Sequence, residues 1–91
     1  MTATELIALA EKVGETEVET EVEALEVIYG HGVADEVVGH EGFEPRSVVR
    51  VDEWLLWTDS QGFTDAERCD SVEEAVKAVE LFAKETEETD D

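Results

Sequence analysis

The sequence contains no asparagine, only three lysines and a single cysteine. Cys69 therefore cannot form a disulfide within the chain, which agrees with a reducing compartment. No apolar run approaches the about 20 residues that a membrane-spanning helix needs. Residues 1–13 include Glu5 and Glu11 and lack the basic start of a secretory signal. We therefore expect a soluble protein of the cytoplasm that does not contact membranes.

Positive charge is also scarce, because six Lys and Arg residues face 26 Asp and Glu residues and leave a net charge of −20. At low ionic strength such repulsion destabilises the compact state. In 1 M salt the Debye length falls to about 3 Å, so neighbouring carboxylates hardly interact. This composition resembles that of cytoplasmic proteins of halophilic archaea, a resemblance that involves no functional motif. It implies a salt-rich solvent and diffuse hydrated cations around the surface.

Length and hydrophobicity predict one small globular domain. A chain of 91 residues can close one hydrophobic core but has too little apolar surface for two. Its 42% of hydrophobic residues lies within the range of globular proteins. We place the domain at residues 1–84. Residues 85–91 (ETEETDD) contain nothing apolar to anchor them, so we expect an acidic disordered tail.

The first segment predicts a short helix that begins at Thr2 or Thr4 and ends at Gly14. Thr at either position can accept a hydrogen bond from the free backbone amides of a first turn. Glycine at position 14 suits the left-handed residue that follows many helices. The apolar residues recur with helical spacing and form one stripe: Leu6, Leu9, Ala10 and Val13.

Residues 15–29 fit two patterns. Glutamates at every odd position from 15 to 23 alternate with Thr, Val and Ala, which is typical of a half-exposed strand. The same segment has a helical stripe at Val18, Val22, Leu25 and Tyr29, and Thr16 with Glu19 matches a capping box. We favour the helix because Glu is depleted in strands and Gly30 suits a helix end.

The densest apolar run, Trp54 to Trp57, belongs to a predicted β-hairpin. We expect one strand from Ser47 to about Thr58, with its core face formed by Val49, Val51, Leu55 and Trp57. Asp59-Ser60-Gln61-Gly62 has the residues of a hairpin turn with a bulge, and 63–69 returns as a second strand.

The segments on either side of the hairpin are a loop and a helix. Residues 31–45 contain both histidines and the proline. Within them, residues 33–38 fit either a turn of helix or a short third strand. Asp70 or Ser71 caps the last helix, and Ser71 with Glu74 matches a capping box. The fold class is therefore α+β: two N-terminal helices, an antiparallel hairpin of two or three strands and a C-terminal helix.

The predicted strand from Ser47 to Thr58 is apolar on both faces near Trp54–Trp57. This pattern predicts a contact surface. If Leu55 and Trp57 face the core, Trp54 and Leu56 form an exposed patch unless the C-terminal helix or a second subunit covers them. Arg50 and Arg68 flank this patch, and an exposed arginine over an indole adds about 0.5–1 kcal/mol. The commonest way to bury such a patch is a two-fold homodimer.

Catalytic and metal-binding motifs are absent from the sequence. His31, His40 and Cys69 are the soft or borderline metal ligands, but they lack the closely spaced pairs of zinc sites. Glu67 and Asp70 should raise the pKa of Cys69, which disfavours a nucleophilic thiol. Neither a phosphate-binding glycine motif nor a calcium loop occurs. We expect no cofactor, and His31 and His40 remain weak metal candidates.

The sequence thus favours a non-enzymatic protein–protein interaction module, with a homodimer as the expected form. The alternative is a small enzyme or metal-dependent domain that uses the His31–His40 loop. Nucleic-acid binding through arginines and tryptophans on one hairpin face is less favoured, because three arginines stand against a charge of −20. Those hairpin residues are Arg46, Arg50, Arg68, Trp54 and Trp57.

Overall fold

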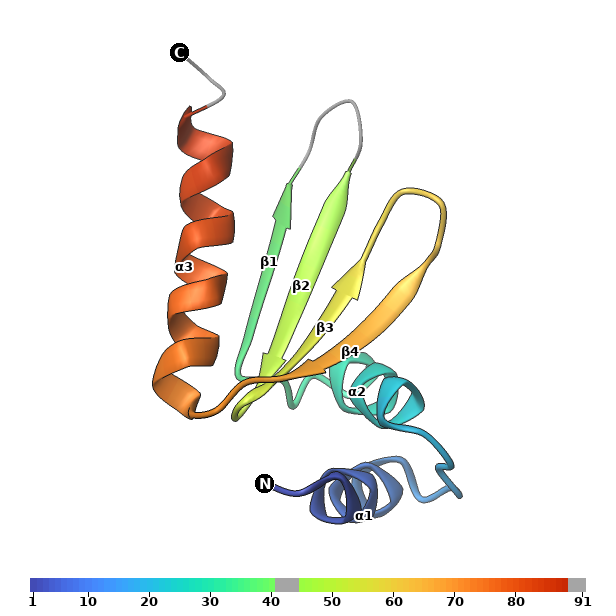
Figure 1. The fold of residues 1–91 in the computed structure, drawn as a ribbon. Helices are drawn as coiled ribbons and strands as arrows, with labels where there is room; N and C mark the ends of the chain where they lie inside the picture. Colours follow the sequence, from blue (N-terminus) through green and yellow to red (C-terminus); the bar gives the residue numbers. More distant parts are fainter. Residues whose placement is uncertain (41–44, 89–91) are drawn as a thin grey trace.

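The computed structural model describes residues 1–40 and 45–88 and arranges them as three helices and one four-stranded sheet (Figure 1). Its α+β class and its order of helices are those predicted, but the sheet has four strands rather than two or three. The elements are α1 (Ala3–Gly14), α2 (Glu21–Gly30), β1 (Glu36–His40), β2 (Arg46–Val51), β3 (Trp54–Thr58), β4 (Thr64–Arg68) and α3 (Val72–Glu88).

A tight turn at Asp52 and Glu53 divides the predicted long strand into β2 and β3. These strands pair antiparallel, with Val51 opposite Trp54 and Val49 opposite Leu56. Asp52 has a φ of 51°, in the left-handed region that Asp enters more readily than most residues. The prediction of one continuous strand from Ser47 to Thr58 is therefore wrong.

The turn also changes which side chains share a face of the sheet. In one continuous strand all odd residues lie on the same side. In the hairpin, Val49 and Val51 share a face with Trp54 and Leu56, since paired residues point the same way. The predicted core face was therefore wrong, and Leu55 and Trp57 lie on the opposite side.

The four strands form an antiparallel meander in the order β1-β2-β3-β4. The helices lie on both of its faces. On one side, α2 packs mainly on β4 and β3, and α1 packs on α2; we call this side the α1/α2 face. On the other, α3 packs mainly on β1 and β2; we call it the α3 face. Each edge strand is thus covered by a helix on one face only.

Each face carries its own hydrophobic cluster. The buried cluster on the α1/α2 face comprises Leu6, Ala10, Val18, Ala24, Leu25, Ile28, Val49, Val51, Trp54 and Leu56. The cluster on the α3 face is smaller and comprises Val48, Leu55, Ala75, Val79 and Phe82. The predicted apolar stripe of the first helix supplies Leu6 and Ala10 to the first of these clusters, and α3 supplies Ala75, Val79 and Phe82 to the second.

The start of α1 follows the prediction, whereas its end does not. Thr2 Oγ1 accepts a hydrogen bond from the Glu5 amide, and the Glu5 carboxylate accepts one from the Thr2 amide. The left-handed residue is Glu15, with a φ of 51°, and Gly14 is still helical. At Gly14 the two N-terminal helices approach closely, because a Cβ there would lie 2.6 Å from Val27 Cγ1.

The segment that fitted both patterns forms a helix only from Glu21. Thr20 is its N-cap and accepts a hydrogen bond from the Glu23 amide. The predicted capping box at Thr16 and Glu19 is therefore wrong: the N-cap lies one turn later, and the Glu23 carboxylate accepts from the Glu19 amide rather than from that of Thr20. Helix is the correct choice for the second half of 15–29, and β1 is the short third strand that the sequence left open.

The hairpin turn and the last helix begin as predicted. Gly62 donates to the Asp59 carbonyl at 3.1 Å and has a φ of 84°, as the bulged turn requires. Ser71 Oγ accepts from the Glu74 amide. Helix α3 continues to Glu88, into the segment predicted as a tail, whereas 89–91 and the loop residues 41–44 lie outside the described residues. Within the described ranges, no helix has the length and apolar character to cross a bilayer.

Candidate functional site

The predicted contact residues Trp54 and Leu56 are part of the protein's own core. They are 6% and 3% exposed, beneath the two N-terminal helices. The Trp54 indole also donates to the Met1 carbonyl at 2.9 Å. The exposed patch that the sequence argument allowed is therefore covered within the chain, by α1 and α2 rather than by α3. A dimer contact has to be sought elsewhere.

The two predicted arginines lie on opposite faces of the sheet. Arg68 pairs with Trp54 on the α1/α2 face, and its guanidinium carbon lies 5.8 Å from the indole centroid. Arg50 lies on the α3 face, opposite Leu55, and its guanidinium approaches Asp35 and Glu36 at 3.7 and 3.9 Å. Since Trp57 and Arg46 share the α3 face, the predicted nucleic-acid surface on a single hairpin face is not formed.

Glu53 in the β2–β3 turn links three parts of the chain. Its carboxylate oxygens accept hydrogen bonds from the Met1 amino group at 2.7 and 2.8 Å, and one of them lies 3.4 Å from Arg68 Nη2. The bond from the amino group lowers the pKa of Glu53 below its usual value, although burial acts in the opposite direction. This ionised carboxylate therefore ties the tight turn to the beginning of the chain and to β4.

The two histidines lie in different parts of the fold, and each contacts a backbone carbonyl. His31 caps the end of α2, and its Nδ1 lies 2.9 Å from the Val27 carbonyl oxygen. His40, at the end of β1, stacks on Phe82 with ring centroids 3.6 Å apart, and its Nε2 meets the Phe82 carbonyl oxygen. Among the described side chains, those of residues 1–40 and 45–85, no group of three or more His, Cys, Asp or Glu could hold a metal ion.

Cys69 follows β4 and is half-buried against the α3 cluster. Burial is the largest cause that raises the pKa of its thiol, and the carboxylates of Glu67, Glu74 and Asp70 raise this pKa further. The thiol is therefore protonated at neutral pH, in the direction that its acidic neighbours predict. Such a thiol is a poor nucleophile.

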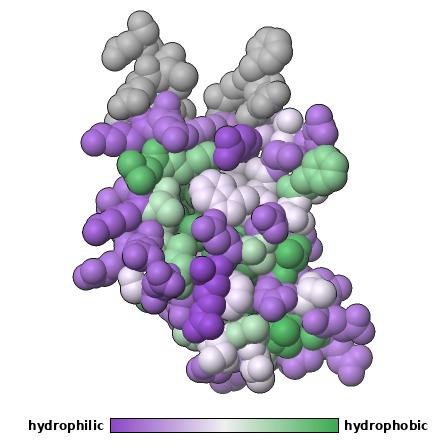
Figure 2. Space-filling view, in the orientation of Figure 1, coloured by the Kyte–Doolittle hydropathy of each residue, from purple (hydrophilic) through white to green (hydrophobic). Residues whose placement is uncertain are grey.

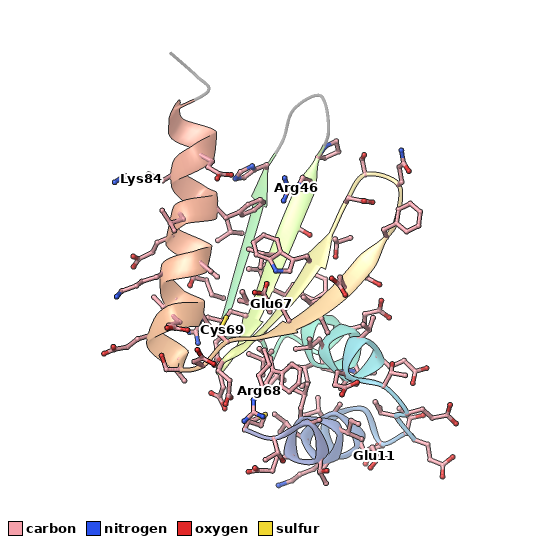
Figure 3. All side chains as sticks on the ribbon, viewed as in Figure 1. Glu11, Arg46, Glu67, Arg68, Cys69 and Lys84 are labelled. Carbon is pink, nitrogen blue, oxygen red and sulfur yellow. The ribbon has the colours of Figure 1, made fainter. Side chains whose placement is uncertain are left out.

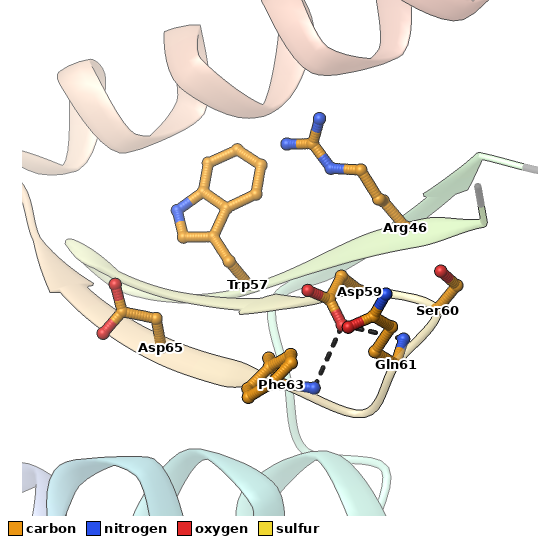
Figure 4. Close-up of a pocket in the computed structure, with 7 residues that line it drawn as sticks. All are labelled: Arg46, Trp57, Asp59, Ser60, Gln61, Phe63 and Asp65. Atoms are coloured by element: carbon orange, nitrogen blue, oxygen red, sulfur yellow. Dashed lines mark hydrogen bonds between the residues drawn. The ribbon is translucent and has the colours of Figure 1, made fainter.

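A hollow of about 460 Å³ lies on the α3 face, beside the strand that α3 leaves uncovered (Figure 4). We call it the hairpin recess. Its volume falls within the roughly 300–1,000 Å³ that is typical of small-molecule sites. Its walls come from β2, β3, β4 and the loop between the last two strands. The lining residues are Arg46, Trp57, Asp59, Ser60, Gln61, Phe63 and Asp65.

The Trp57 indole extends from the sheet towards α3, lines the recess and is held from two sides. Its Nε1 donates to Glu67 Oε2 at 3.0 Å, and Phe82 of α3 meets its ring edge to face, with centroids 5.3 Å apart. Edge-to-face aromatic pairs of this kind contribute about 0.5–1.5 kcal/mol. The indole therefore has a defined orientation before any ligand arrives.

The loop wall is held by one carboxylate. Asp59 Oδ1 accepts hydrogen bonds from the Gln61 amide at 2.9 Å and from the Phe63 amide at 3.0 Å. Both bonds are drawn in Figure 4. Phe63, the most exposed of the large hydrophobic side chains described, is 69% exposed beside this loop. Because Asp59 holds the Phe63 backbone by a hydrogen bond, the point from which this exposed side chain extends is fixed.

Arg46 and Asp65 are charged residues of the recess that form no ion pair with the described residues. In the sheet, Asp65 lies directly opposite Trp57, whereas Arg46 lies two residues along β2 from Val48, the other residue opposite Trp57. The Arg46 guanidinium carbon lies 5.5 Å from the Phe82 centroid. No described carboxylate lies within ion-pair distance of Arg46, and Asp65 has no ion pair or side-chain hydrogen bond with any residue of the described ranges.

A second open area lies at the other edge of the sheet, on the α1/α2 face of β1. We call it the β1 quarter and define it by Val37, Gly39 and the preceding Val33. Val37 shares this face with Val49, yet it is 47% exposed because α2 packs on the other strands. Val33 has the same exposed fraction. The β1 quarter is therefore apolar, whereas the hairpin recess mixes aromatic and charged groups.

The view in Figure 2 shows how little apolar surface this acidic protein exposes on the side drawn. Hydrophilic side chains cover most of it, and the hydrophobic ones occur as small separate areas. Figure 3 places Arg46 and Arg68 toward opposite ends of the sheet and Lys84 on the side of α3 away from it. These three cations are thus far from one another rather than gathered into a basic patch.

Comparison of the chain with protein-family models, with curated proteins and with solved structures finds no match. The residues of both open areas thus have to be interpreted from their own geometry. Val37, Phe63 and the role of Trp57 could not be predicted from the sequence, because all three depend on which face each helix covers. A turn placed at Asp52–Glu53 would have shown that Trp54, and not Trp57, shares a face with Val49 and Val51.

Proposed function

We propose that this chain is a non-enzymatic interaction module that forms a homodimer through the β1 quarter. The observation that supports this proposal is the exposure of Val37. It lies on the part of the α1/α2 face that the chain's own helices leave uncovered. An apolar side chain of this kind, at the edge of a sheet, is a common point of contact between proteins.

The charges around β1 favour a second copy as the partner. A two-fold contact brings together two chains that each carry a charge of −20, so it has to avoid unpaired carboxylates. Asp35 and Glu36, the acidic residues closest to Val37 in sequence, both lie near Arg50, which compensates part of their charge. The β1 quarter therefore opposes association less than the rest of this acidic surface.

Salt should strengthen the association. We propose, from the composition, that the acidic surface is an adaptation to a salt-rich solvent. In molar KCl the Debye length is about 3 Å, so repulsion between the copies is screened. The dimer and the fold should both be lost as KCl falls towards the millimolar range, because the carboxylates are then unscreened.

Sedimentation in molar KCl tests the proposal with a matched pair of variants. Val37 and Val72 are 47% and 46% exposed, but Val72 lies at the start of α3, outside the β1 quarter. We expect a dimer for the parent chain and for Val72→Lys, and a folded monomer for Val37→Lys. A monomeric parent at high concentration, or a Val37→Lys variant that dimerises as the parent does, would exclude this dimer.

A further inference from the structure

We propose that the hairpin recess binds a free aromatic α-amino acid, with its carboxylate on Arg46, its ammonium group on Asp65 and its ring against Trp57 and Phe63. The inference concerns a site on the opposite face from the β1 quarter and does not depend on the dimer. It rests on three features of the recess: its unpaired opposite charges, its fixed aromatic surface and its size.

The two charges lie on either side of the indole. Asp65 is the cross-strand neighbour of Trp57, and Arg46 belongs to β2, two strands away from Asp65 and two residues along from Val48, which pairs with Trp57. Neighbouring strands are about 4.8 Å apart, so the two backbones are separated by about 10 Å across the sheet. A long arginine side chain leaves room between the charges for a group that carries both a carboxylate and an ammonium.

Because neither side chain has an ion pair within the described residues, both are available to such a ligand. Arg46 has no ion pair among the described residues, although the chain has 26 acidic side chains. By contrast, Arg50 and Arg68 both approach carboxylates. A guanidinium stacked near Phe82 presents its N–H donors in a planar fork, which suits a carboxylate.

The aromatic groups give the site its preference for a ring. Trp57 is held by Glu67 and Phe82, so little conformational entropy is lost when a ligand packs on it. Phe63 rises from a loop fixed by Asp59, and Ser60 and Gln61 add hydrogen-bonding groups at the same wall. A ligand with one charge only would leave either Arg46 or Asp65 unpaired.

The field of the whole protein acts on the two ends of this ligand in opposite ways. A charge of −20 repels a carboxylate and attracts an ammonium group. A zwitterion has no net charge, so its binding should depend less on salt than that of a simple anion or cation. Molar KCl leaves mainly the short-range contacts within the recess, because it screens longer distances.

The test is a titration of the ¹⁵N-labelled protein in molar KCl with L-phenylalanine, read at the Trp57 indole N–H. Phenethylamine, which lacks the carboxylate, and 3-phenylpropanoate, which lacks the ammonium group, serve as matched ligands. Arg46→Gln and Asp65→Asn remove one contact each. Lys84→Gln and Asp70→Asn are the control variants, because they change the same charges outside the recess.

We expect saturable binding of L-phenylalanine to the parent and to both controls, and affinity about tenfold or more weaker for each recess variant. Arg46→Gln should leave phenethylamine binding unchanged, and Asp65→Asn should leave that of 3-phenylpropanoate unchanged. No saturable shift at Trp57 in the folded parent would overturn the proposal. Equal losses with all three ligands, or equal losses in the control variants, would also overturn it.

Discussion

Trp54 and Trp57 are three residues apart on one strand, and they lie in different environments. Trp54 is buried beneath two helices, whereas Trp57 is half-buried beside a single helix that leaves its neighbouring strand uncovered. The difference comes from the helices, since both residues belong to the same short apolar run. Exposure of an apolar side chain in a small two-faced sheet is therefore decided by which strands each helix reaches.

The same comparison holds for the two edge strands. At β1 the uncovered face carries Val37, and at β4 it carries Asp65 and Glu67. Charged residues are a common protection of an exposed sheet edge, and β4 has them. β1 has an exposed valine instead. This contrast is why we assign self-association to β1 and ligand binding to the area beside β4.

Alanine substitution of each tryptophan should give the largest difference between the two faces. Trp54→Ala removes a buried ring from the larger cluster and should lower the free energy of unfolding by about 3–5 kcal/mol. Trp57→Ala should cost distinctly less, because its ring is partly solvated and packs on one helix. Urea unfolding of both variants in molar KCl measures the difference. Equal losses would mean that the two faces contribute alike.

Glycine substitutions test the packing of α1 against α2, with an expected loss of stability of intermediate size. A Cβ at Gly14 would lie 2.6 Å from Val27 Cγ1, and a β-branched valine has little freedom to move away. Gly14→Ala should therefore destabilise the protein by about 1–3 kcal/mol. Gly30→Ala is the control, since a Cβ there meets nothing within 4 Å. A Gly14→Ala variant as stable as Gly30→Ala would contradict this close approach of α1 and α2.

Glu53→Gln should give a smaller effect that depends on pH. The Met1 amino group lowers the folded-state pKa of Glu53, so its contribution is complete above the unfolded-state pKa and is lost as pH falls through the folded value. At pH 7 the variant should be about 1 kcal/mol less stable than the parent. Thermal melts over an acid series should show the two stabilities converging below the lowered pKa. A gap that is constant with pH would exclude this ionic contact.

The fold class, the helices, the Asp59–Gly62 turn and the caps at Thr2 and Ser71 could be predicted because they depend on neighbouring residues. The site could not. Its positions depend on the Asp52–Glu53 turn, which has no glycine, proline or asparagine to mark it. One missed turn reversed the faces of every residue from Trp54 to Thr58, because side chains alternate along a strand.

The role of β1 was equally hidden, for a different reason. Its sequence, EVVGH, is short and has glycines nearby, so the local residue pattern does not distinguish a helix from a strand. Pairing with Arg46–Val51 decides it, and pairing between distant segments is not encoded in local periodicity. The same tertiary effect places Trp54 under α1 and α2, where the sequence suggested a patch that needed a cover.

Acrylamide quenching of tryptophan fluorescence tests the difference between the two faces most directly, and a neutral quencher avoids the charge of the protein. Trp57→Phe leaves Trp54 as the single emitter, and Trp54→Phe leaves Trp57. In molar KCl, with both variants shown to be folded, Trp54 should be weakly quenched and Trp57 clearly more so. Equal quenching of the two, or stronger quenching of Trp54, would contradict the account that α1 and α2 bury Trp54 while α3 leaves Trp57 partly exposed.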